Sequence, residues 1–223
     1  MNIKTIIKVF STAQNDQDAQ YMKSYMKGLF HYYGIKSDKR RALSKPFIKA
    51  AQSLPKSEVI AKVLELYELK EREMHHLGLE ICIPYFKKNT DESDIIFFES
   101  LAKKNQWWDT IDVIAPKLMA HYFLTYPNNR DFYVTKWLAT GDKWLVRCAL
   151  LFQLKYKTKT DLGLLFETIL SIPPTKEFFI NKAIGWMLRE NSRLFPEAVV
   201  DFVTDNENYL SNLSKKEALR LLK

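Results

Sequence analysis

The sequence contains few residues of the kinds that mark disulfide-rich, metal-binding or loop-rich proteins. Its 223 residues include two cysteines, six glycines and eight prolines. Cys82 and Cys148 lie far apart in apolar runs, so they match neither a zinc-binding CxxC pair nor a disulfide framework. We expect both to be buried free thiols. Because glycine and proline are scarce, we also expect short turns between regular elements.

Long apolar stretches are absent as well. No run reaches the roughly 18 residues of a membrane-spanning helix. The first ten residues carry charge and lack the apolar core of a signal peptide. The sequence therefore predicts a cytoplasmic protein without a membrane partner.

Basic residues exceed acidic ones. Lysine and arginine number 34 against 26 aspartates and glutamates, which gives a formal net charge of +8 and an isoelectric point near 9.3. Such an excess favours a polyanionic partner, with nucleic acid first and an anionic membrane surface second. The alternative is a soluble basic protein that has no such partner.

Apolar residues recur at helical spacing along most of the chain. The run from Ile3 to Phe10 shows the pattern, and no sustained alternation bounded by hairpin turns indicates a strand. We expect about a dozen helices joined by short polar loops. Two local predictions are a full-length helix over Asn15–Tyr32 and a Ser214-x-x-Glu217 capping box at the last helix.

A small residue followed by an apolar run recurs along the chain. It appears at Gly78, Val113, Ala149 and Ala183, at intervals of 34 to 36 residues. Near-equal spacing of this length is typical of stacked helix pairs, in which each pair buries one face against its neighbour. No linker or change in composition marks a second domain. The sequence therefore predicts an all-α fold, a right-handed superhelical stack of antiparallel helix pairs (HEAT-like repeats, an α-solenoid) with a concave basic face, in one domain over residues 1–223.

Side chains near these repeated positions are expected to line one wall. Trp108, Asp112, Arg147 and Trp186 would bring a carboxylate, a guanidinium and two indoles together. A guanidinium suits a phosphate, and indole faces accept cations and stack on bases or sugars. The alternative is that the tryptophans belong to the core and that Asp112 is a helix-surface charge.

Four segments are similar to one protein family. They are YMKGLFHYYGIKSDKRR (25–41), WWDTID (107–112), WLVRCALLFQLKYK (144–157) and KEFFINKAIGWMLRE (176–190). With them, the chain resembles the HEAT-like-repeat alkylpurine DNA glycosylases, the AlkD family of bacterial DNA alkylation-repair enzymes, along nearly its whole length.

The resemblance implies roles for individual residues. Trp108 and Trp186 would cradle the lesion nucleotide, and Asp112 would be the catalytic carboxylate. Arg147 would hold the neighbouring phosphate. The basic residues expected to contact DNA are Lys39, Arg40 and Arg41 on a DNA-facing third helix, together with Lys143, Lys155 and Lys157. Asp38 departs from the family, which has proline there.

The resemblance also concerns the second helix. In the family this helix reaches the minor groove, and members that have lost it have lost excision. A full-length helix over Asn15–Tyr32 would argue against such a loss here.

The chemistry can be argued from the residues of this set. Hydrolysis of an N-glycosidic bond passes through an oxocarbenium-like sugar. The set offers one carboxylate and no histidine, because His31, His75, His76 and His121 lie outside it. One carboxylate suffices when the leaving base is already cationic, as in a purine alkylated at N3 or N7. Together with this chemistry, the resemblance implies a monofunctional DNA glycosylase of base excision repair, a monomer that acts on double-stranded DNA carrying alkylated purines without a metal or cofactor.

Two alternatives remain open at this stage. One is a catalytically silent paralogue that binds distorted DNA, and the other is a helical-repeat scaffold that binds protein. Basic residues gathered on one face would favour DNA, and residues scattered over all faces would favour a scaffold. An excision assay is needed to separate an enzyme from a silent binder.

Overall fold

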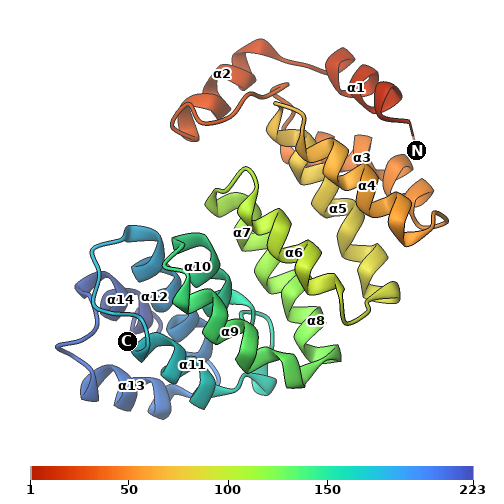
Figure 1. Ribbon diagram of the computed structural model, residues 1–223. Helices are drawn as coiled ribbons and strands as arrows, with labels where there is room; N and C mark the ends of the chain where they lie inside the picture. Colours follow the sequence, from red (N-terminus) through yellow and green to blue (C-terminus); the bar gives the residue numbers. More distant parts are fainter. Residues whose placement is uncertain (1, 223) are drawn as a thin grey trace. The chain divides into compact units, whose positions relative to one another are not determined.

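The computed structural model describes residues 2–222, which are built from helices (Figure 1). They form fourteen α-helices, one π-helix (Ile114–Met119) and two short 3-10 turns. The first five α-helices are α1 (Ile3–Thr12), α2 (Asp16–Tyr25), α3 (Ser37–Ala51), α4 (Lys56–Tyr67) and α5 (Arg72–Asn89). The others are α6 (Asp94–Lys103), α7 (Trp108–Val113), α8 (Ala120–Thr125), α9 (Arg130–Ala139), α10 (Lys143–Leu151), α11 (Leu162–Leu170), α12 (Phe178–Ser192), α13 (Pro196–Asp205) and α14 (Asn212–Ala218). The prediction of an all-α fold is confirmed.

The chain divides into two compact units. Unit 1 ends at Thr90, after α5, and unit 2 begins at Asp91, before α6. The single domain over residues 1–223 stays a prediction, and its two end residues lie outside the described range. None of the helices within residues 2–222 combines the length and the apolar character that a membrane crossing requires.

Unit 1 is organised around α5. Its side chains Met74, Leu77 and Ile81 are fully buried, and α5 contacts both α3 and α4. Gly78 lies against Tyr67 of α4, where an added Cβ would come within 3.1 Å of the tyrosine ring. This small residue therefore sets how closely α4 and α5 approach.

The second helix is shorter than predicted. Asn15 is its N-cap, with the side chain accepting a first-turn backbone N–H at 2.9 Å. The helix expected over Asn15–Tyr32 nevertheless ends at Tyr25. Lys27 and Gly28 have φ angles of 56° and 76°, and a left-handed backbone of this kind stops an α-helix. The predicted extent is therefore wrong at the C-terminal end.

A buried carboxylate ties the chain after α2 to α5. Glu73 accepts the backbone N–H groups of Tyr33, Gly34 and Ile35 at 3.1, 3.0 and 3.1 Å. Burial raises the pKa of Glu73, and these N–H groups oppose the rise. Gly34 has a φ of +79°, and a Cβ there would lie 2.0 Å from the Asn15 carbonyl oxygen. A side chain larger than hydrogen therefore overlaps the backbone at this crossing.

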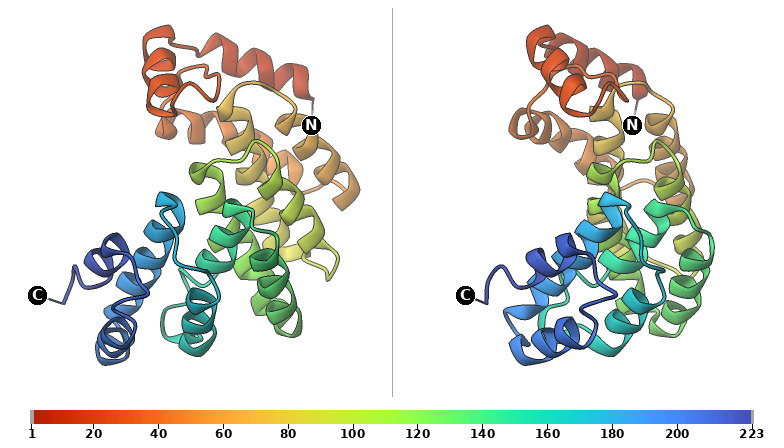
Figure 2. Two further views of the ribbon diagram at one scale, coloured as in Figure 1. Left: turned by 60° about the vertical axis from the view of Figure 1, so that its left-hand side comes forward. Right: turned by 90° about the vertical axis from the view of Figure 1, so that its left-hand side faces the viewer.

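In unit 2, the second helices of successive pairs form a row. α7, α10 and α12 contact one another in this order, and α14 packs along α12; we call these four helices the central row. Figure 2 shows the helices of unit 2 from two further directions. The 35-residue interval reappears across this row, because Asp112 pairs with Arg147 and Lys182 pairs with Glu217.

The last helix is capped differently from the prediction. Ser211 is the N-cap of α14, and its hydroxyl oxygen accepts the Ser214 N–H at 3.1 Å. The Ser214 hydroxyl donates to the Asn181 carbonyl at 2.9 Å, and Glu217 bonds to Lys182. The predicted Ser214-x-x-Glu217 capping box is therefore wrong, because both side chains fasten α14 to α12.

Both cysteines are fully buried. Cys82 lies in α5 of unit 1 and Cys148 in α10 of unit 2, and neither belongs to a disulfide. Burial raises the pKa of the Cys148 thiol. This placement agrees with the expectation of two buried thiols.

Candidate active site

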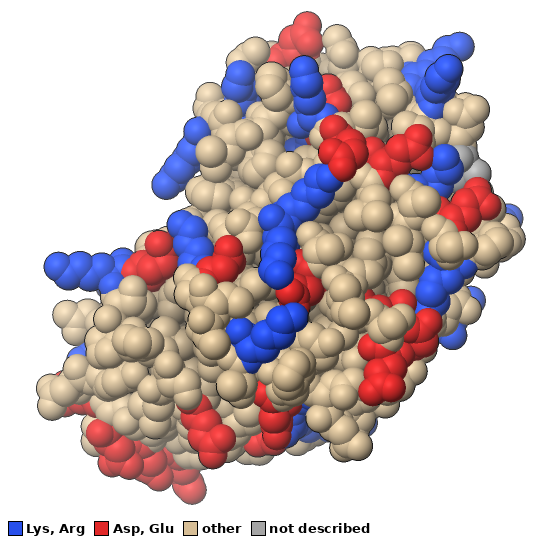
Figure 3. All heavy atoms as spheres, in the orientation of Figure 1, with Lys and Arg blue, Asp and Glu red and all other residues tan. Residues whose placement is uncertain are grey.

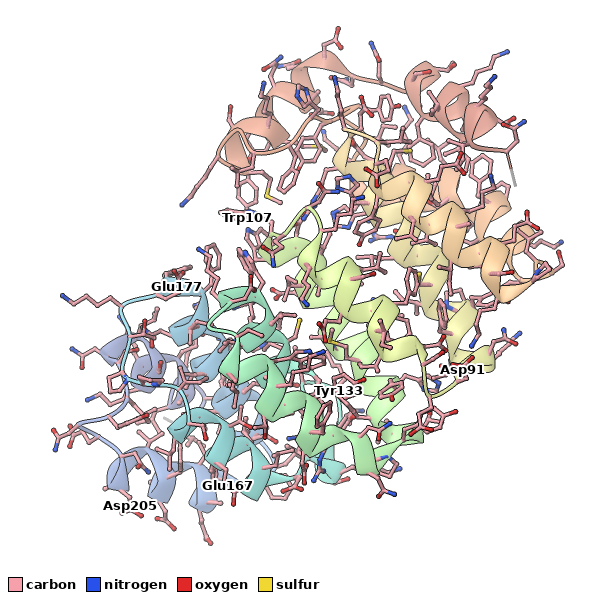
Figure 4. All side chains as sticks on the ribbon, viewed as in Figure 1. Asp91, Trp107, Tyr133, Glu167, Glu177 and Asp205 are labelled. Atoms are coloured by element: carbon pink, nitrogen blue, oxygen red, sulfur yellow. The ribbon has the colours of Figure 1, made fainter. Side chains whose placement is uncertain are left out.

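The chain enters α7 through Trp107, whose indole packs in an aromatic cluster. Its ring centroid lies 5.5 Å from that of Trp144 and 5.2 Å from that of Phe179, which are 4.9 Å from each other. These three residues, here called the aromatic cluster, come from the starts of α7, α10 and α12. Figure 4 shows Trp107 and Glu177 at the entries of α7 and α12, on the same side of unit 2.

Asp112 in α7 forms a two-point ion pair with Arg147 in α10. Arg147 Nε donates to Asp112 Oδ1 at 2.8 Å, and Nη2 donates to Oδ2 at 2.9 Å. Nη1 donates to the carbonyl of Phe179 in α12 at 2.5 Å, so one guanidinium links three helices of the central row. The Arg147 side chain is 4% exposed and that of Asp112 is 17% exposed. The carboxylate is therefore the more accessible partner of a shielded pair.

The pKa of Asp112 reflects this environment. Burial raises its pKa above the ordinary aspartate value, and the hydrogen bonds and charge of Arg147 oppose the rise. The nearby charge of Asp109 adds to it. A carboxylate has about four lone-pair positions, and Arg147 uses two of them. Asp112 can therefore still accept a hydrogen bond from water or face a cation.

A π-helix follows Asp112 almost at once. It spans Ile114–Met119 and contains Pro116. Proline lacks the N–H that would bond the Asp112 carbonyl four residues earlier in an α-helix. A π turn shifts each bond by one residue, so the helix continues past the missing donor. Such turns often occur at functional sites, and the sequence reasoning did not anticipate this one.

Both indoles expected at the site lie on the central row and are partly exposed. Trp108 begins α7 four residues before Asp112, so their side chains share one face of the helix. Trp186 lies in α12, four residues after Lys182, which is 35 residues beyond Arg147 in the sequence.

The aromatic cluster itself was missed by the sequence reasoning. A usable signal was present, because Trp144 and Phe179 stand one repeat interval apart at the starts of successive helices. Trp107 had no comparable signal, because the sequence does not show which of the two adjacent tryptophans, Trp107 or Trp108, packs in the aromatic cluster.

The predicted basic residues do not all lie together. Lys143, at the start of α10, approaches Glu177 at 3.5 Å, and its Nζ lies 5.4 Å from the Trp144 ring centroid. A cleft of about 660 Å³ opens beside it, between α10 and the loop before α12. Lys155 and Lys157 are exposed beyond the other end of α10. Lys143 and the aromatic cluster thus share one edge of unit 2, and the other two lysines lie toward the opposite edge.

The remaining predicted basic residues belong to α3 in unit 1. Lys39 and Arg41 are exposed, and Arg41 pairs with Asp38. Arg40 is largely covered and pairs with Glu80 at 3.1 Å. Exposure therefore leaves Lys39 and Arg41 more accessible than Arg40 to a partner.

Within residues 2–222, no three or more histidine, cysteine, aspartate and glutamate side chains are grouped so that they could hold a metal ion. His75 is buried in α5, where its Nε2 lies 2.8 Å from the Leu69 carbonyl oxygen.

Comparison with known proteins shows the family. The chain matches the family model described as DNA alkylation repair enzyme over residues 6–222, whereas none of the curated proteins matches it. A solved structure described as a predicted DNA alkylation repair enzyme from Enterococcus faecalis is 28% identical, with a TM-score of 0.86 over 94% of this chain and 96% of that one. Protein smu.31 from Streptococcus mutans UA159 shares the fold at 16% identity, with a TM-score of 0.59 over 82% of this chain and 96% of its own. Because the family model spans nearly the whole chain, this protein belongs to the DNA alkylation repair enzyme family.

Proposed function

We propose that this protein is a monofunctional DNA glycosylase that removes purines alkylated at N3 or N7 from duplex DNA. The family supports a role in DNA alkylation repair. The observation that carries the more specific proposal is the shielded carboxylate of Asp112, held at two points by Arg147 on the central row. Helices of the same row also carry the partly exposed indoles of Trp108 and Trp186.

Asp112 acts on the sugar in this proposal. Cleavage of the N-glycosidic bond builds positive charge on the sugar. A carboxylate about 4 Å away stabilises that charge by roughly 4 kcal/mol at an effective dielectric constant near 20, or about a thousandfold in rate. The same carboxylate orients the attacking water. Because an N3- or N7-alkylated purine is cationic and leaves as a neutral base, the reaction needs no general acid.

Trp108 and Trp186 provide flat faces for the damaged nucleotide. An indole face attracts a cation by about 0.5–2 kcal/mol. A cationic base and, later, the cationic sugar both meet this condition, whereas an undamaged base does not. The two tryptophans thus add selectivity for alkylated purines to the charge of Asp112.

We assign Arg147 a different role from the phosphate contact that the resemblance implies. Its side chain is 4% exposed, and its donors already bond Asp112 and Phe179. To bind a phosphate, it would have to leave these partners. Arg147 is therefore a positioning residue, which fixes the direction of the Asp112 carboxylate and favours its charged form.

Double-stranded DNA is the proposed partner, bound by a monomer. The side chains of Lys39, Arg41, Lys155 and Lys157 are exposed, so that phosphates can reach them, Arg41 while paired with Asp38, and Lys143 lies at the edge that carries the aromatic cluster. Such contacts position the duplex without reading its sequence. Because the three lysines of unit 2 do not gather on one face, it is the family match that favours DNA over a protein-binding scaffold.

Base release from duplex DNA tests the proposal. Excess protein is incubated with duplexes that contain N7-methylguanine or N3-methyladenine, and with matched duplexes that contain uracil or hypoxanthine. We expect release of the cationic bases alone. Equal release of the neutral bases would contradict a mechanism with one carboxylate. Binding without release would favour a silent paralogue, and failure to bind DNA would favour a protein-binding scaffold.

A further inference from the structure

A cation cluster occupies the C-terminal end of the central row. Glu217 of α14 is 7% exposed and pairs with Lys182 and Arg189 of α12, and its Oε1 lies 3.7 Å from Arg220 Nη1. We call Lys182, Arg189 and Arg220 the cation cluster. Gly185 makes room for it, because a Cβ there would lie 2.6 Å from Glu217 Cβ. The carboxylate is thus held where three cations converge.

Positive charge in the cluster exceeds negative charge. Glu217 faces three cations. Near Arg189 the charge of Glu190 is matched by that of Arg193, so a local positive excess remains. Burial lowers the pKa of Lys182, and the charges of Arg189 and Arg220 lower it further. Burial and the charges of Arg220 and Arg193 also lower the pKa of Arg189, and the charge of Glu190 opposes them. The lowered pKa values of Lys182 and Arg189 reflect repulsion between neighbouring positive charges, which a bound anion relieves.

The cations of the cluster are accessible. The side chains of Lys182, Arg189 and Arg220 are 40%, 22% and 69% exposed, in contrast to the 4% exposure of Arg147. The cluster can therefore meet a ligand without a rearrangement of the fold.

The charges of unit 2 are distributed unevenly between the central row and the helices α11 and α13 that pack against it. The cations of the cluster lie on or just after central-row helices, whereas exposed acidic residues gather on α11 and α13. These are Glu167, Glu197, Asp201 and Asp205. Figure 3 shows acidic side chains along its lower edge, where Figure 4 labels Glu167 and Asp205. A polyanion is therefore drawn to the central row.

We propose that the cation cluster binds a backbone phosphate of the substrate duplex. This inference rests on the proposed function for its partner, double-stranded DNA. Asp112, Arg147, Lys182 and Glu217 follow one another at 35-residue intervals across the central row. Neighbouring packed helices lie about 8–10 Å apart, so the cluster lies roughly 16–20 Å from Asp112. At 3.4 Å per base pair, it reaches a phosphate about five base pairs from the damaged nucleotide.

Salt-dependent binding of undamaged duplex DNA tests the cluster without any excision. The variants are Lys182→Gln, Arg189→Gln and Arg220→Gln, and the matched control is Lys216→Gln, an exposed lysine of α14 outside the cluster. Because the three cations share one phosphate, each cluster variant should break this contact and lower the slope of log affinity against log salt by about 0.9, and combined variants should lower it no further. Between 50 and 200 mM salt, the affinity of such a variant should therefore fall about 3.5-fold less than that of the wild type. The control should bind like the wild type.

Truncation of the duplex locates the contact. A lesion-containing duplex that ends about three base pairs from the lesion on one flank should lose the phosphate. The wild type should then bind it as weakly as Arg220→Gln binds the longer duplex, and Arg220→Gln should lose nothing further. Arg220 is largely exposed, so this variant tests the proposal even if Arg189→Gln fails to fold.

Several results would overturn the proposal. One is an unchanged salt slope for Lys182→Gln and Arg220→Gln, and another is an equal effect of the control Lys216→Gln. A third is that inorganic phosphate at constant ionic strength raises the Tm of the protein while the cluster variants bind DNA like the wild type. The last would identify a site for free phosphate. If the wild type excises no base but the cluster variants still lower the salt slope, the proposed glycosylase activity is refuted and the proposed DNA contact stands.

Discussion

Replacement of Asp112 by asparagine isolates the charge of one carboxylate. The side chain keeps its shape, loses its negative charge and retains one oxygen to accept from Arg147. On the proposed mechanism, single-turnover excision of a cationic alkylpurine falls about 10²–10³-fold, and DNA binding changes little. Protonation should have the same effect in the wild type. Because burial raises the pKa of Asp112, excision should decline on the acid side above the ordinary aspartate range.

The same substitution also affects folding. From the sequence alone, no loss of stability is expected, but the ion pair with Arg147 changes that expectation. A buried guanidinium without its counter-ion costs roughly 3 kcal/mol of folding free energy, the low end of the usual range of about 3–5 kcal/mol. The low value applies because burial already disfavours the ionised form of Asp112. For 223 residues, such a loss lowers Tm by about 6–12 °C. Excision is therefore measured well below the transition, with helix content checked by circular dichroism.

Two further variants separate charge from stability. Asp109→Asn removes a carboxylate from the same helix and leaves the ion pair in place, so excision at neutral pH should persist. The double variant Asp112→Asn/Arg147→Met removes both charges and should recover part of the lost stability, while it stays inactive. The reasoning is refuted if Asp112→Asn excises at the wild-type rate, or if the double variant regains excision.

Two other predictions concern stability. The pKa of Glu99 is lowered to about 2: burial raises it, but hydrogen bonds from Lys103, Lys136 and Trp137 outweigh that effect. Its ionised form therefore contributes up to about 3 kcal/mol above the unfolded pKa, and this contribution is lost as the pH falls from about 5 toward 2. Glu99→Gln should show a shallower acid-side decline in Tm than wild type, and the exposed control Glu197→Gln should not; equal declines would contradict the effect. Gly34→Ala should lower the free energy of unfolding in urea by about 3 kcal/mol or more, from left-handed backbone plus overlap. Gly28→Ala, with a similar φ but nothing within 4 Å, should cost about 1 kcal/mol, and equal losses would rule out the overlap.

The helical periodicity of the sequence was sufficient to predict the fold class. Apolar spacing reports burial on one face of each helix, and that burial does not depend on any particular partner. The repeat interval also predicted that Asp112 and Arg147 would lie on one wall, and the structure places them in contact. The sequence did not show that the two would bond each other, because Arg147 suits a phosphate as well as a carboxylate.

Local motifs were less reliable where tertiary contacts compete for the same side chain. Ser211 and Ser214, like Ser214 and Glu217, stand three residues apart, so spacing alone fits a cap at either serine. In the structure Glu217 pairs with Lys182 of α12 and is not available for a capping box, and Ser211 is the N-cap. The sequence Lys27-Gly28 was a local signal for the end of α2. The helix was predicted to continue beyond it because the apolar spacing continues there. Pro116 was visible in the sequence, but the π turn around it depends on packing that a single helix does not reveal.

The way in which α2 is attached has a consequence for its dynamics. This helix buries none of its residues, so its position depends on its ends, at Asn15 and at the loop held by Glu73. Opening it exposes little apolar surface, and its local stability is far below that of α5. Amide hydrogens of α2 should therefore exchange with solvent long before those of α5, while the N–H groups bonded to Glu73 stay protected. The exposed Tyr21 and Tyr25 are thus carried by a segment that can unfold and refold while the core of unit 1 stays intact.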